Sequence, residues 1–276
     1  MKYYLYNSLS NNGIKPEFLE IVERLENTEI KEIIDLDYQE FLKNLKEEDE
    51  LVIVGGDGTL NYFVNEIKDL EINNKIYYRA SGTGNDFMHD IEKIDGEEIL
   101  INQYVHNLPT VYVKDVERKF LNGVGYGIDG YCCEVADEIK KKTPNKKINY
   151  TGIAIKGLLF HFKSATATIT VDGREYVHEN VWIAPTMKGR FYGGGMMVAP
   201  NQDRLSDEVS VVVYHAKSRL KALMSFPSIF KGEHIKKEKM VSIYTGKEIT
   251  VKFDRSCALQ IDGETVLDVT EYKVVA

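Results

Sequence analysis

The pattern of hydrophobic and polar residues changes character near residue 108. Before this point strand-like and helix-like stretches alternate, which predicts parallel βαβ units and a doubly wound sheet. The run Leu51–Val54 is continuously apolar, as in a strand buried on both faces. The expected strands are Lys2–Asn7, Glu29–Ile34, Leu51–Val54 and Lys75–Ala80, and the expected helices are Pro16–Asn27, Tyr38–Lys46 and a third beginning near Leu60.

After Pro109 short β-rich runs separated by turn residues dominate, which predicts an antiparallel sandwich or barrel. The runs are Val111–Val116, Ala165–Val171, Tyr176–Ala184, Val209–Tyr214, Ser242–Thr245, Ile249–Phe253 and Ala258–Ile261, with helical stretches at Cys133–Lys141 and Tyr150–Phe162. We therefore expect an α/β domain at residues 1–108 and a β-sandwich domain at residues 109–276.

The strongest chemical motif lies in Leu51–Ile67, LVIVGGDGTLNYFVNEI. Glycines let a backbone approach an anion closely, and a helix N-terminus adds a favourable dipole. The segment Gly55–Asn61 is therefore predicted to cradle phosphate. Asp57 inside it would repel naked phosphate, but it could hold Mg²⁺ or orient a reacting hydroxyl. The structural alternative is a tight turn capped by an aspartate.

Two motifs together carry a resemblance to a known family. GGDGTLN resembles the diacylglycerol kinase catalytic-domain family, which includes bacterial lipid kinases and sphingosine kinases, and phosphofructokinases and NAD kinases have related turns. Arg79–Phe87, RASGTGNDF, is similar to the lipid kinases in particular. The resemblance implies that residues 1–108 form a nucleotide-binding domain, with the active site in the cleft between it and the β-sandwich domain. It also implies that Thr83 and Asn85 contact the nucleotide. The implied phosphate-binding residues are Gly55, Gly56, Asp57, Gly58, Thr59 and Asn61, with Asp57 also holding the metal and acting in catalysis.

Three further segments follow in the order that the family shows. Asn122–Gly130, NGVGYGIDG, resembles a Gly-x-Gly-x-Asp segment and implies that Asp129 is a second carboxylate facing the cleft. Phe191–Pro200 contains the family's three glycines, interpreted as backbone architecture. In QIDGE near the C-terminus, the resemblance implies that Asp262 or Glu264 accepts the hydroxyl proton. The alternatives are an aspartate in a turn for Asp129 and an ordinary hairpin turn for Asp262-Gly263.

The sequence departs from the family in two loops. Asn7–Gly13 stands where the family has Asn-Pro-x-Ser-Gly, so that Asn7 matches and Ser10 and Asn11 are candidate contacts. The family's Asp-Asp-Gly magnesium loop corresponds to Asn201–Glu208, where Asp207 is the candidate ligand and Glu208 replaces glycine. The resemblance implies an ATP- and Mg²⁺-dependent transferase of lipid metabolism and phospholipid biosynthesis, which phosphorylates a diacylglycerol-like hydroxyl. An NAD kinase-like enzyme and a non-catalytic nucleotide-binding regulator are the alternatives.

Composition and charge bear on partners and location. The net charge of −8 argues against nucleic acid as a partner. No apolar run is long enough to span a bilayer, and the cysteines form neither a disulfide framework nor a zinc spacing, which predicts a cytoplasmic protein. Lys140–Lys142, Lys146-Lys147 and Ile153–Phe162 could dock on the inner face of the membrane, where the lipid substrate lies, or could be a solvated loop beside a core helix. A homodimer is left open.

Overall fold

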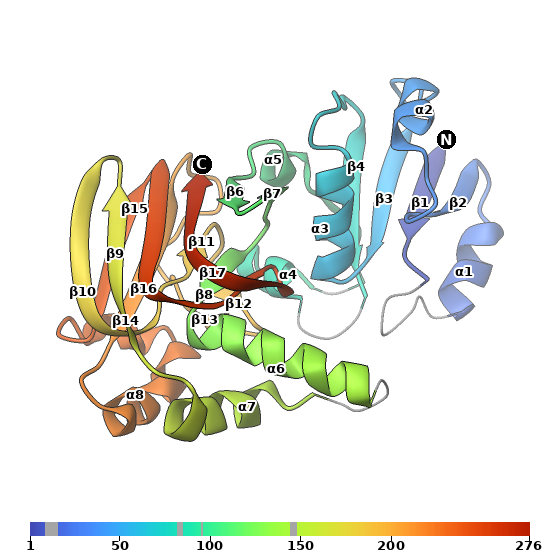
Figure 1. Cartoon of the computed structure of the whole chain (residues 1–276). Helices are drawn as coiled ribbons and strands as arrows, with labels where there is room; N and C mark the ends of the chain where they lie inside the picture. The colour runs from blue at the N-terminus through green and yellow to red at the C-terminus, as the bar shows by residue number, and fades with distance from the viewer. Residues whose placement is uncertain (9–15, 82–84, 95, 144–147) are drawn as a thin grey trace. The chain divides into compact units, whose positions relative to one another are not determined.

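The computed structural model describes residues 1–8, 16–81, 85–94, 96–143 and 148–276. It divides into two compact units, Met1–Leu108 and Pro109–Ala276. Figure 1 shows the course of the chain, with strands and helices alternating in the first unit and strands dominating the second. Among the described helices, none combines the length and the apolar character that crossing a bilayer would require.

The first unit is built on a mainly parallel sheet. Its strands lie in the order β2-β1-β3-β4-β5, and only β5 runs antiparallel to its neighbour. The described elements are β1 (Lys2–Tyr6), α1 (Pro16–Glu23), β2 (Thr28–Glu32), α2 (Tyr38–Lys43), β3 (Glu50–Gly55), α3 (Asp57–Glu66), β4 (Lys75–Ala80), α4 (Asp86–Asp90), β5 (Ile99–Leu100) and α5 (Asn102–Val105).

Alternation of side chains along β1 explains why helices cover both faces of this sheet. Successive residues of a strand point to opposite faces. Tyr4 packs edge-on against Phe18 of α1, whereas the neighbouring Tyr3 packs edge-on against Phe41 of α2. The central strand β3 is buried from Leu51 onward, as expected for a strand covered on both sides.

The second unit is dominated by antiparallel strands. They are β6 (Thr110–Val113), β7 (Val116–Lys119), β8 (Gly123–Tyr126), β9 (Ala165–Val171), β10 (Arg174–Ile183), β11 (Thr186–Met187), β12 (Phe191–Tyr192), β13 (Met196–Met197), β14 (Val209–His215), β15 (Val241–Gly246), β16 (Glu248–Ile261) and β17 (Glu264–Val275). The helices are α6 (Ile128–Lys142), α7 (Tyr150–Lys156), the π-helical turn η1 (Gly157–His161), α8 (Arg219–Ser225) and the 3₁₀ turns η2 (Phe226–Ile229) and η3 (Glu233–Lys236).

The large sheet of the second unit has one strand position that two short strands share. Strands β10 and β11 lie along one edge of β14, whose other edge pairs with β15. On their opposite edge β10 pairs with β9 and β11 with β8, and β16 in turn pairs with β9 along its first half and with β8 along its second. Apolar side chains of these strands, together with residues of β6 and β17, form one buried core, in which Tyr126 stacks on Phe253 with ring centroids 4.0 Å apart.

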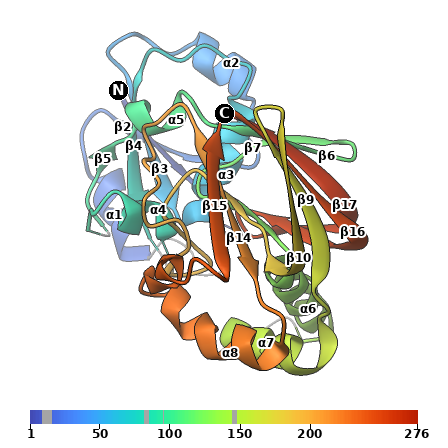
Figure 2. The same ribbon diagram turned by 90° about the vertical axis from the view of Figure 1, so that its left-hand side faces the viewer.

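Helices of the second unit pack against this sheet and against one another. Figure 1 shows α6 beneath the strands with α7 and α8 close to it, and Figure 2 shows α7 and α8 side by side from another direction. Helix α6 packs directly on β16, because Gly130 brings its backbone against Ala258 O, where a Cβ atom would overlap the carbonyl.

These observations confirm the predicted class, a doubly wound α/β part followed by an antiparallel β part. Several expectations in the second unit were wrong in detail. Val111–Val116 is interrupted by a turn in which Lys114 has a φ of 51°, which makes it a hairpin of β6 and β7. Ile249–Phe253 and Ala258–Ile261 belong to the single strand β16, whose pairing with β17 is irregular between them. Strands β8 and β17 and helix α8 were not expected.

The contact between α6 and β16 gives a stability prediction. We expect Gly130→Ala to lower the free energy of unfolding by about 1–3 kcal/mol, because the helix must move away from the Ala258 carbonyl. Gly58→Ala in α3 is the matched control, since a Cβ there meets no atom within 4 Å and should stabilise by up to about 1 kcal/mol. Chemical denaturation measures both, and equal effects would contradict the packing argument.

Candidate active site

The glycine turn lies at the carboxyl edge of the parallel sheet, where open α/β sheets bind ligands. Gly55 ends β3 opposite Ala80, the last residue of β4, and α3 begins two residues later at Asp57. A Cβ at Gly55 would overlap the side chain of Thr59, which is itself buried. The carbonyl of Gly55 accepts hydrogen bonds from Ser81 N at 2.9 Å and from the Tyr78 hydroxyl at 3.0 Å. The turn is therefore fixed by its neighbours on β4.

Asp57 connects the two predicted nucleotide motifs. Its Oδ2 accepts hydrogen bonds from the backbone N–H of Asp86 at 2.8 Å and of Phe87 at 3.4 Å. These N–H groups belong to the first turn of α4, whose amides a carboxylate satisfies well. The Asp57 carboxylate thus holds the segment after β4 against the turn after β3. Asp57 does not cap its own turn, since the N-cap of α3 is Gly56 and has no side-chain hydrogen bond. Its metal and catalytic roles stay predictions.

Asn85 carries a polar side chain that is buried without a hydrogen bond inside the described part of the chain. It is 8% exposed, and neither its Oδ1 nor its Nδ2 has a partner there. It lies beside the glycine turn, because a Cβ built on Gly56 would be 3.8 Å from Asn85 Oδ1. A buried amide without partners costs free energy, so such a group commonly marks a position that a polar ligand completes.

The other predicted contacts of the first unit vary in position. Asn7 follows β1 at the same edge of the sheet, since Tyr6 pairs with Val54. Asn61 is buried in α3, where its side-chain and backbone oxygens accept from Asn65 Nδ2 at 3.3 and 2.8 Å. Gly58 is exposed at the start of the helix. Ser10, Asn11 and Thr83 lie outside the described residues. The predicted set therefore gathers at one edge as far as the structure describes it.

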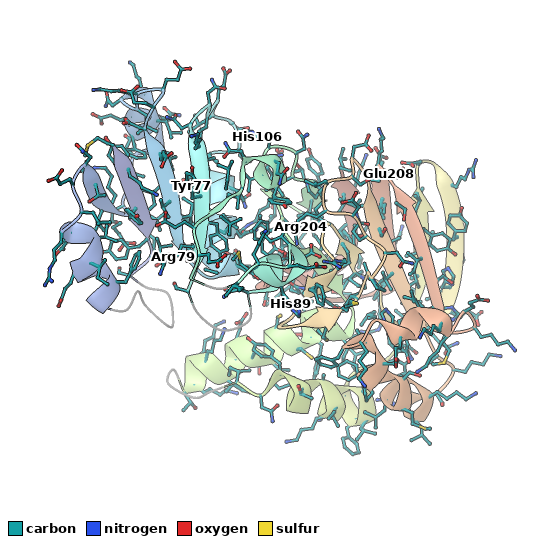
Figure 3. All side chains as sticks on the ribbon, turned by 180° about the vertical axis from the view of Figure 1, so that it is seen from behind. Tyr77, Arg79, His89, His106, Arg204 and Glu208 are labelled. Atoms are coloured by element: carbon teal, nitrogen blue, oxygen red, sulfur yellow. The ribbon has the colours of Figure 1, made fainter. Side chains whose placement is uncertain are left out.

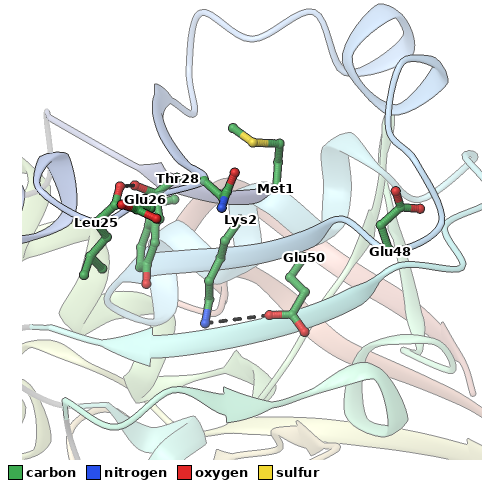
Figure 4. A pocket seen from close by; sticks show the side chains of 9 residues that line it. Met1, Lys2, Leu25, Glu26, Thr28, Glu48 and Glu50 are labelled. Atoms are coloured by element: carbon green, nitrogen blue, oxygen red, sulfur yellow. Dashed lines mark hydrogen bonds and ion pairs between the residues drawn. The ribbon is translucent and has the colours of Figure 1, made fainter.

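A hollow in the first unit lies at the other end of the sheet. Figure 4 shows it, with Lys2, Thr28 and Glu50 among its lining residues. These residues lie at the starts of β1, β2 and β3, whereas Gly55 lies at the end of β3. Ligands of open α/β sheets bind outside the carboxyl ends of the strands. This hollow therefore lies at the wrong end of the sheet to be the predicted phosphate-binding site.

In the second unit, Asp262 is an internal hydrogen-bond acceptor. Its carboxylate receives the backbone N–H groups of Leu121, Asn122 and Gly123 at 2.5, 2.9 and 3.0 Å. Burial raises the pKa of Asp262, while these hydrogen bonds and the nearby Arg204 work in the opposite direction. With Gly263 it forms the two-residue turn between β16 and β17, both residues having positive φ. Asp262 therefore ties this hairpin to the chain entering β8.

Glu264 begins β17 and points to solvent. Its carboxylate is paired with both terminal nitrogens of Arg118 on β7, and its side chain is 61% exposed. The bidentate pairing with Arg118 fixes the orientation of the Glu264 carboxylate. The two acidic residues of the terminal motif are thus in different environments, one engaged by backbone amides and one held at the surface by an arginine.

Asp129 lies in the first turn of α6 and meets the triple-glycine segment. The Tyr192 hydroxyl donates a hydrogen bond to Asp129 Oδ2, just before Gly193–Gly195, all three of which have positive φ. Burial raises the pKa of Asp129 to about 7, although the Tyr192 hydrogen bond lowers it. Two motifs separated by more than sixty residues are therefore joined at one carboxyl group.

The loop Asn201–Glu208 does not fit a metal ion. Its Asp207 carboxylate is 77% exposed and pairs with Lys247 Nζ at 2.5 Å. The buried ammonium of Lys188 donates to Ser206 O at 2.5 Å, and the guanidinium of Arg204 donates to Leu121 O and Asn122 Oδ1 at 2.6 and 2.7 Å. Arg204 and Glu208 of this loop are labelled in Figure 3. Side-chain cations occupy a region where a bound cation would need oxygen ligands.

Within the described ranges, no three or more His, Cys, Asp or Glu side chains are grouped so that they could hold a metal. The sequence interpretation also missed several partners of the site residues: Arg118 of Glu264, Tyr192 of Asp129, and the cations Lys188 and Arg204. Tyr192 could have been found from its place beside the triple glycine. Arg118 carried no signal, because its partner lies 146 positions away in the chain.

The contrast between the two acidic residues leads to a stability prediction. Asp262→Ala should lower the free energy of unfolding by roughly 3 kcal/mol or more, because three backbone N–H groups lose their acceptor. Glu264→Ala removes only an exposed ion pair and should cost less than about 1 kcal/mol. Urea unfolding of both variants tests the difference. An Asp262→Ala protein as stable as Glu264→Ala would contradict the assigned role.

A second prediction concerns pH. With its folded pKa near 7 and an ordinary value near 4 when unfolded, Asp129 is protonated in the folded state but ionised in the unfolded state over this range. Its contribution to stability is therefore complete below about pH 4, falls as the pH rises, and is lost above about pH 7. Wild type should lose stability relative to Asp129→Asn across this window. Parallel unfolding curves at pH 5 and 8, with a constant difference, would refute the shift.

Comparison with known proteins finds two family models that match the two parts of the chain. The family model described as diacylglycerol kinase catalytic domain matches residues 3–110. The model described as YegS C-terminal NAD kinase beta sandwich-like domain matches residues 122–274, more than half of the chain. A crystal structure of a diacylglycerol kinase from Bacillus anthracis shares the fold, with a TM-score of 0.67 and 18% identity over 99% of this chain and 93% of that one.

Relatives with assigned names agree with the family models. A diacylglycerol kinase of Mycobacterium tuberculosis is 24% identical over 212 residues, which cover 74% of this chain and 67% of that protein. A Bacillus subtilis protein named "Putative lipid kinase YtlR" is 25% identical over 245 residues, which cover 82% of this chain and 77% of the other. The chain therefore belongs to the diacylglycerol kinase catalytic-domain family, and it is a lipid kinase, a phosphotransferase with an alcohol group as acceptor.

Proposed function

We propose that the protein transfers the γ-phosphate of ATP to the hydroxyl group of a diacylglycerol-like lipid. The single observation that carries the nucleotide part is the buried side chain of Asn85, which lies beside Gly56 with its amide lacking a partner inside the described ranges. A nucleotide supplies both acceptors and donors, so it could satisfy the amide that the protein leaves unsatisfied. The diacylglycerol kinase name of the Mycobacterium tuberculosis relative supports the acceptor class.

The glycine turn supplies the electrostatic part of the proposal. Phosphoryl transfer depends mainly on positioning and on neutralising charge, rather than on covalent chemistry by the protein. The N-terminus of the ten-residue helix α3 presents backbone N–H groups at the edge where the turn lies. Thr59 and Gly55 fix the path of that turn, so the donors are held in place before the nucleotide arrives.

Mg²⁺ is proposed to enter with ATP rather than to occupy a cage built by the protein. Magnesium commonly keeps several waters and binds through one or two carboxylates plus substrate phosphates. Asp57 is the candidate carboxylate of the first unit. With Mg²⁺ bound, the phosphate charge would be partly neutralised, while Asp57 keeps the first turn of α4 in position through the amides of Asp86 and Phe87.

Glu264 is proposed as the group that accepts the proton of the lipid hydroxyl. Asp262 has three backbone N–H donors on its carboxylate, which stabilise its charge and restrict its movement. Glu264 is exposed and is oriented by Arg118 from one side. A general base must reach within hydrogen-bond distance of the hydroxyl, directly or through one water, and the exposed carboxylate meets this requirement better.

The proposal is tested with radiolabelled ATP and a panel of acceptors. Wild-type protein with Mg²⁺ should label a lipid in a panel containing diacylglycerol, a sphingoid base, an isoprenoid alcohol and phosphatidylglycerol, and should leave NAD unlabelled. Labelling of NAD in place of lipid would favour the NAD kinase alternative. ATP binding without turnover on any acceptor would favour the nucleotide-binding regulator.

The Asn85 argument is tested by Asn85→Leu. This variant should bind ATP at least about tenfold more weakly, since a charge-free hydrogen bond of about 1–1.5 kcal/mol is lost and apolar bulk replaces it. It should unfold at the same or a higher denaturant concentration, because a buried amide without a described partner is removed. Calorimetric titration and urea unfolding give the two values. Unchanged ATP affinity in a stable variant would remove Asn85 from the binding site.

A further inference from the structure

Two helical segments that flank the large sheet of the second unit form one continuous surface. The first segment is Tyr150–Lys163, which contains α7 and η1, and the second is Lys217–Lys231, which contains α8 and η2. The Arg219 guanidinium fastens them together by donating to Leu158 O at 3.0 Å, while it lies 5.8 Å from the centre of the Trp182 ring. Figure 2 shows α7 and α8 next to each other. We call the exposed residues of these two segments the helical face.

Apolar side chains stand out from the helical face into solvent. Phe160 is 71% exposed and Met224 is 73% exposed. Leu220, four residues before Met224 on α8, is 63% exposed. The inward side of the same segments is already packed, because Ala154, Leu158 and Ala222 are buried in one apolar cluster. The segments therefore have apolar residues on both sides, one set packed toward the core and one set exposed to solvent.

Phe160 owes its position to the π-helical turn. In η1 the N–H of Phe162 donates to the carbonyl of Gly157 at 2.8 Å, five residues back. Leu158 and Phe162 are buried, while Phe160 between them is exposed. Single π-helical turns are rare and are frequent at functional sites. Phe160 therefore lies inside a hydrogen-bonded turn, between two buried residues. Its exposure is a property of the folded chain and not of a frayed helix end.

The charge of the helical face is opposite to that of the whole chain. The chain has a net charge of −8, yet neither segment contains an aspartate or a glutamate. Together the two segments carry six basic residues, Lys156, Lys163, Lys217, Arg219, Lys221 and Lys231. Arg219 is used internally, whereas the five lysines are exposed. A surface that combines exposed large apolar groups with uncompensated lysines matches the interface of an anionic bilayer.

We propose that the helical face docks the protein on a bilayer that contains anionic lipids, with Phe160, Leu220 and Met224 entering the interface and the lysines contacting headgroups. The proposal rests on the proposed function, because a kinase whose acceptor is a membrane lipid must reach that lipid where it is embedded. It keeps Ile153–Phe162 of the sequence expectation but not the other segments named there, Lys140–Lys142 and Lys146-Lys147. Helix α8 and its lysines are the added part.

Vesicle flotation without ATP tests the charge requirement. Wild-type protein should float with vesicles of phosphatidylcholine plus phosphatidylglycerol, and much less with phosphatidylcholine alone. Lys217→Glu with Lys221→Glu should weaken binding to the anionic vesicles by roughly tenfold or more. The matched control is Lys43→Glu with Lys93→Glu, which makes the same change of net charge on exposed lysines of the first unit and should bind like wild type. Equal flotation of the two double variants would overturn the proposal.

A second pair of substitutions tests the apolar requirement. Phe160→Ser with Met224→Ser should also weaken binding by roughly tenfold or more, and since both side chains are exposed the unfolding curve should not change. If these substitutions instead convert a dimer to a monomer on gel filtration and leave flotation unchanged, the face is an interface between copies and the proposal is refuted.

An activity measurement separates this proposal from the proposed function. With a short-chain diacylglycerol dispersed in detergent micelles, both double variants should phosphorylate the acceptor at the wild-type rate, because no bilayer is involved. With anionic vesicles they should be slow, and the defect should diminish as the vesicle concentration rises. Flotation that depends on the helical face in a protein inactive on every acceptor would retain the docking and refute the kinase proposal. Equal rates on vesicles would refute the docking.

Discussion

The amides of Asp86 and Phe87 donate hydrogen bonds to the carboxylate of Asp57. The arrangement of the carboxyl edge of the parallel sheet, where we propose that the nucleotide binds, depends on these hydrogen bonds. They join the glycine turn that follows β3 to the first turn of α4, and glycines by themselves would leave the turn after β3 conformationally free. The same contact places Asn85 beside Gly56 with its amide buried. Asp57, which the sequence marks as a candidate catalytic and metal-binding residue, therefore also fixes the position of these two segments.

The second unit uses charge in a comparable way. Asp262 gathers three amides where the chain enters β8, and Arg204 donates to oxygens of the same segment. Lys188 ends on the carbonyl of Ser206, so the neighbouring loop is held by cations that the chain itself supplies. Each of these buried charged groups makes hydrogen bonds within the chain, which offsets part of the cost of burying it. The exposed Glu264, in contrast, is held at the surface by Arg118.

What could be predicted from sequence was local. The apolar run of β3 and the Asp262-Gly263 turn carry their structure in adjacent residues, and the sequence indicated both. Strand β8, with two glycines in four residues, has no alternation to read, and β17 shifts its phase at Asp268, whose φ is 55°. The pairs Glu264–Arg118 and Asp129–Tyr192 join residues far apart in the chain, so only the fold reveals them. Ser10, Asn11 and Thr83 lie outside the described residues.

The place of β16 in the second sheet has a consequence for how this part of the protein comes apart. Strand β16 lies between β17 and β9 along its first half and between β17 and β8 along its second. It cannot detach without breaking pairing on two sides, whereas among the described strands β7 pairs only with β6 and β15 only with β14. The amides of β16 should therefore exchange with solvent only when the whole unit unfolds, and those of β7 and β15 at a lower free energy of opening.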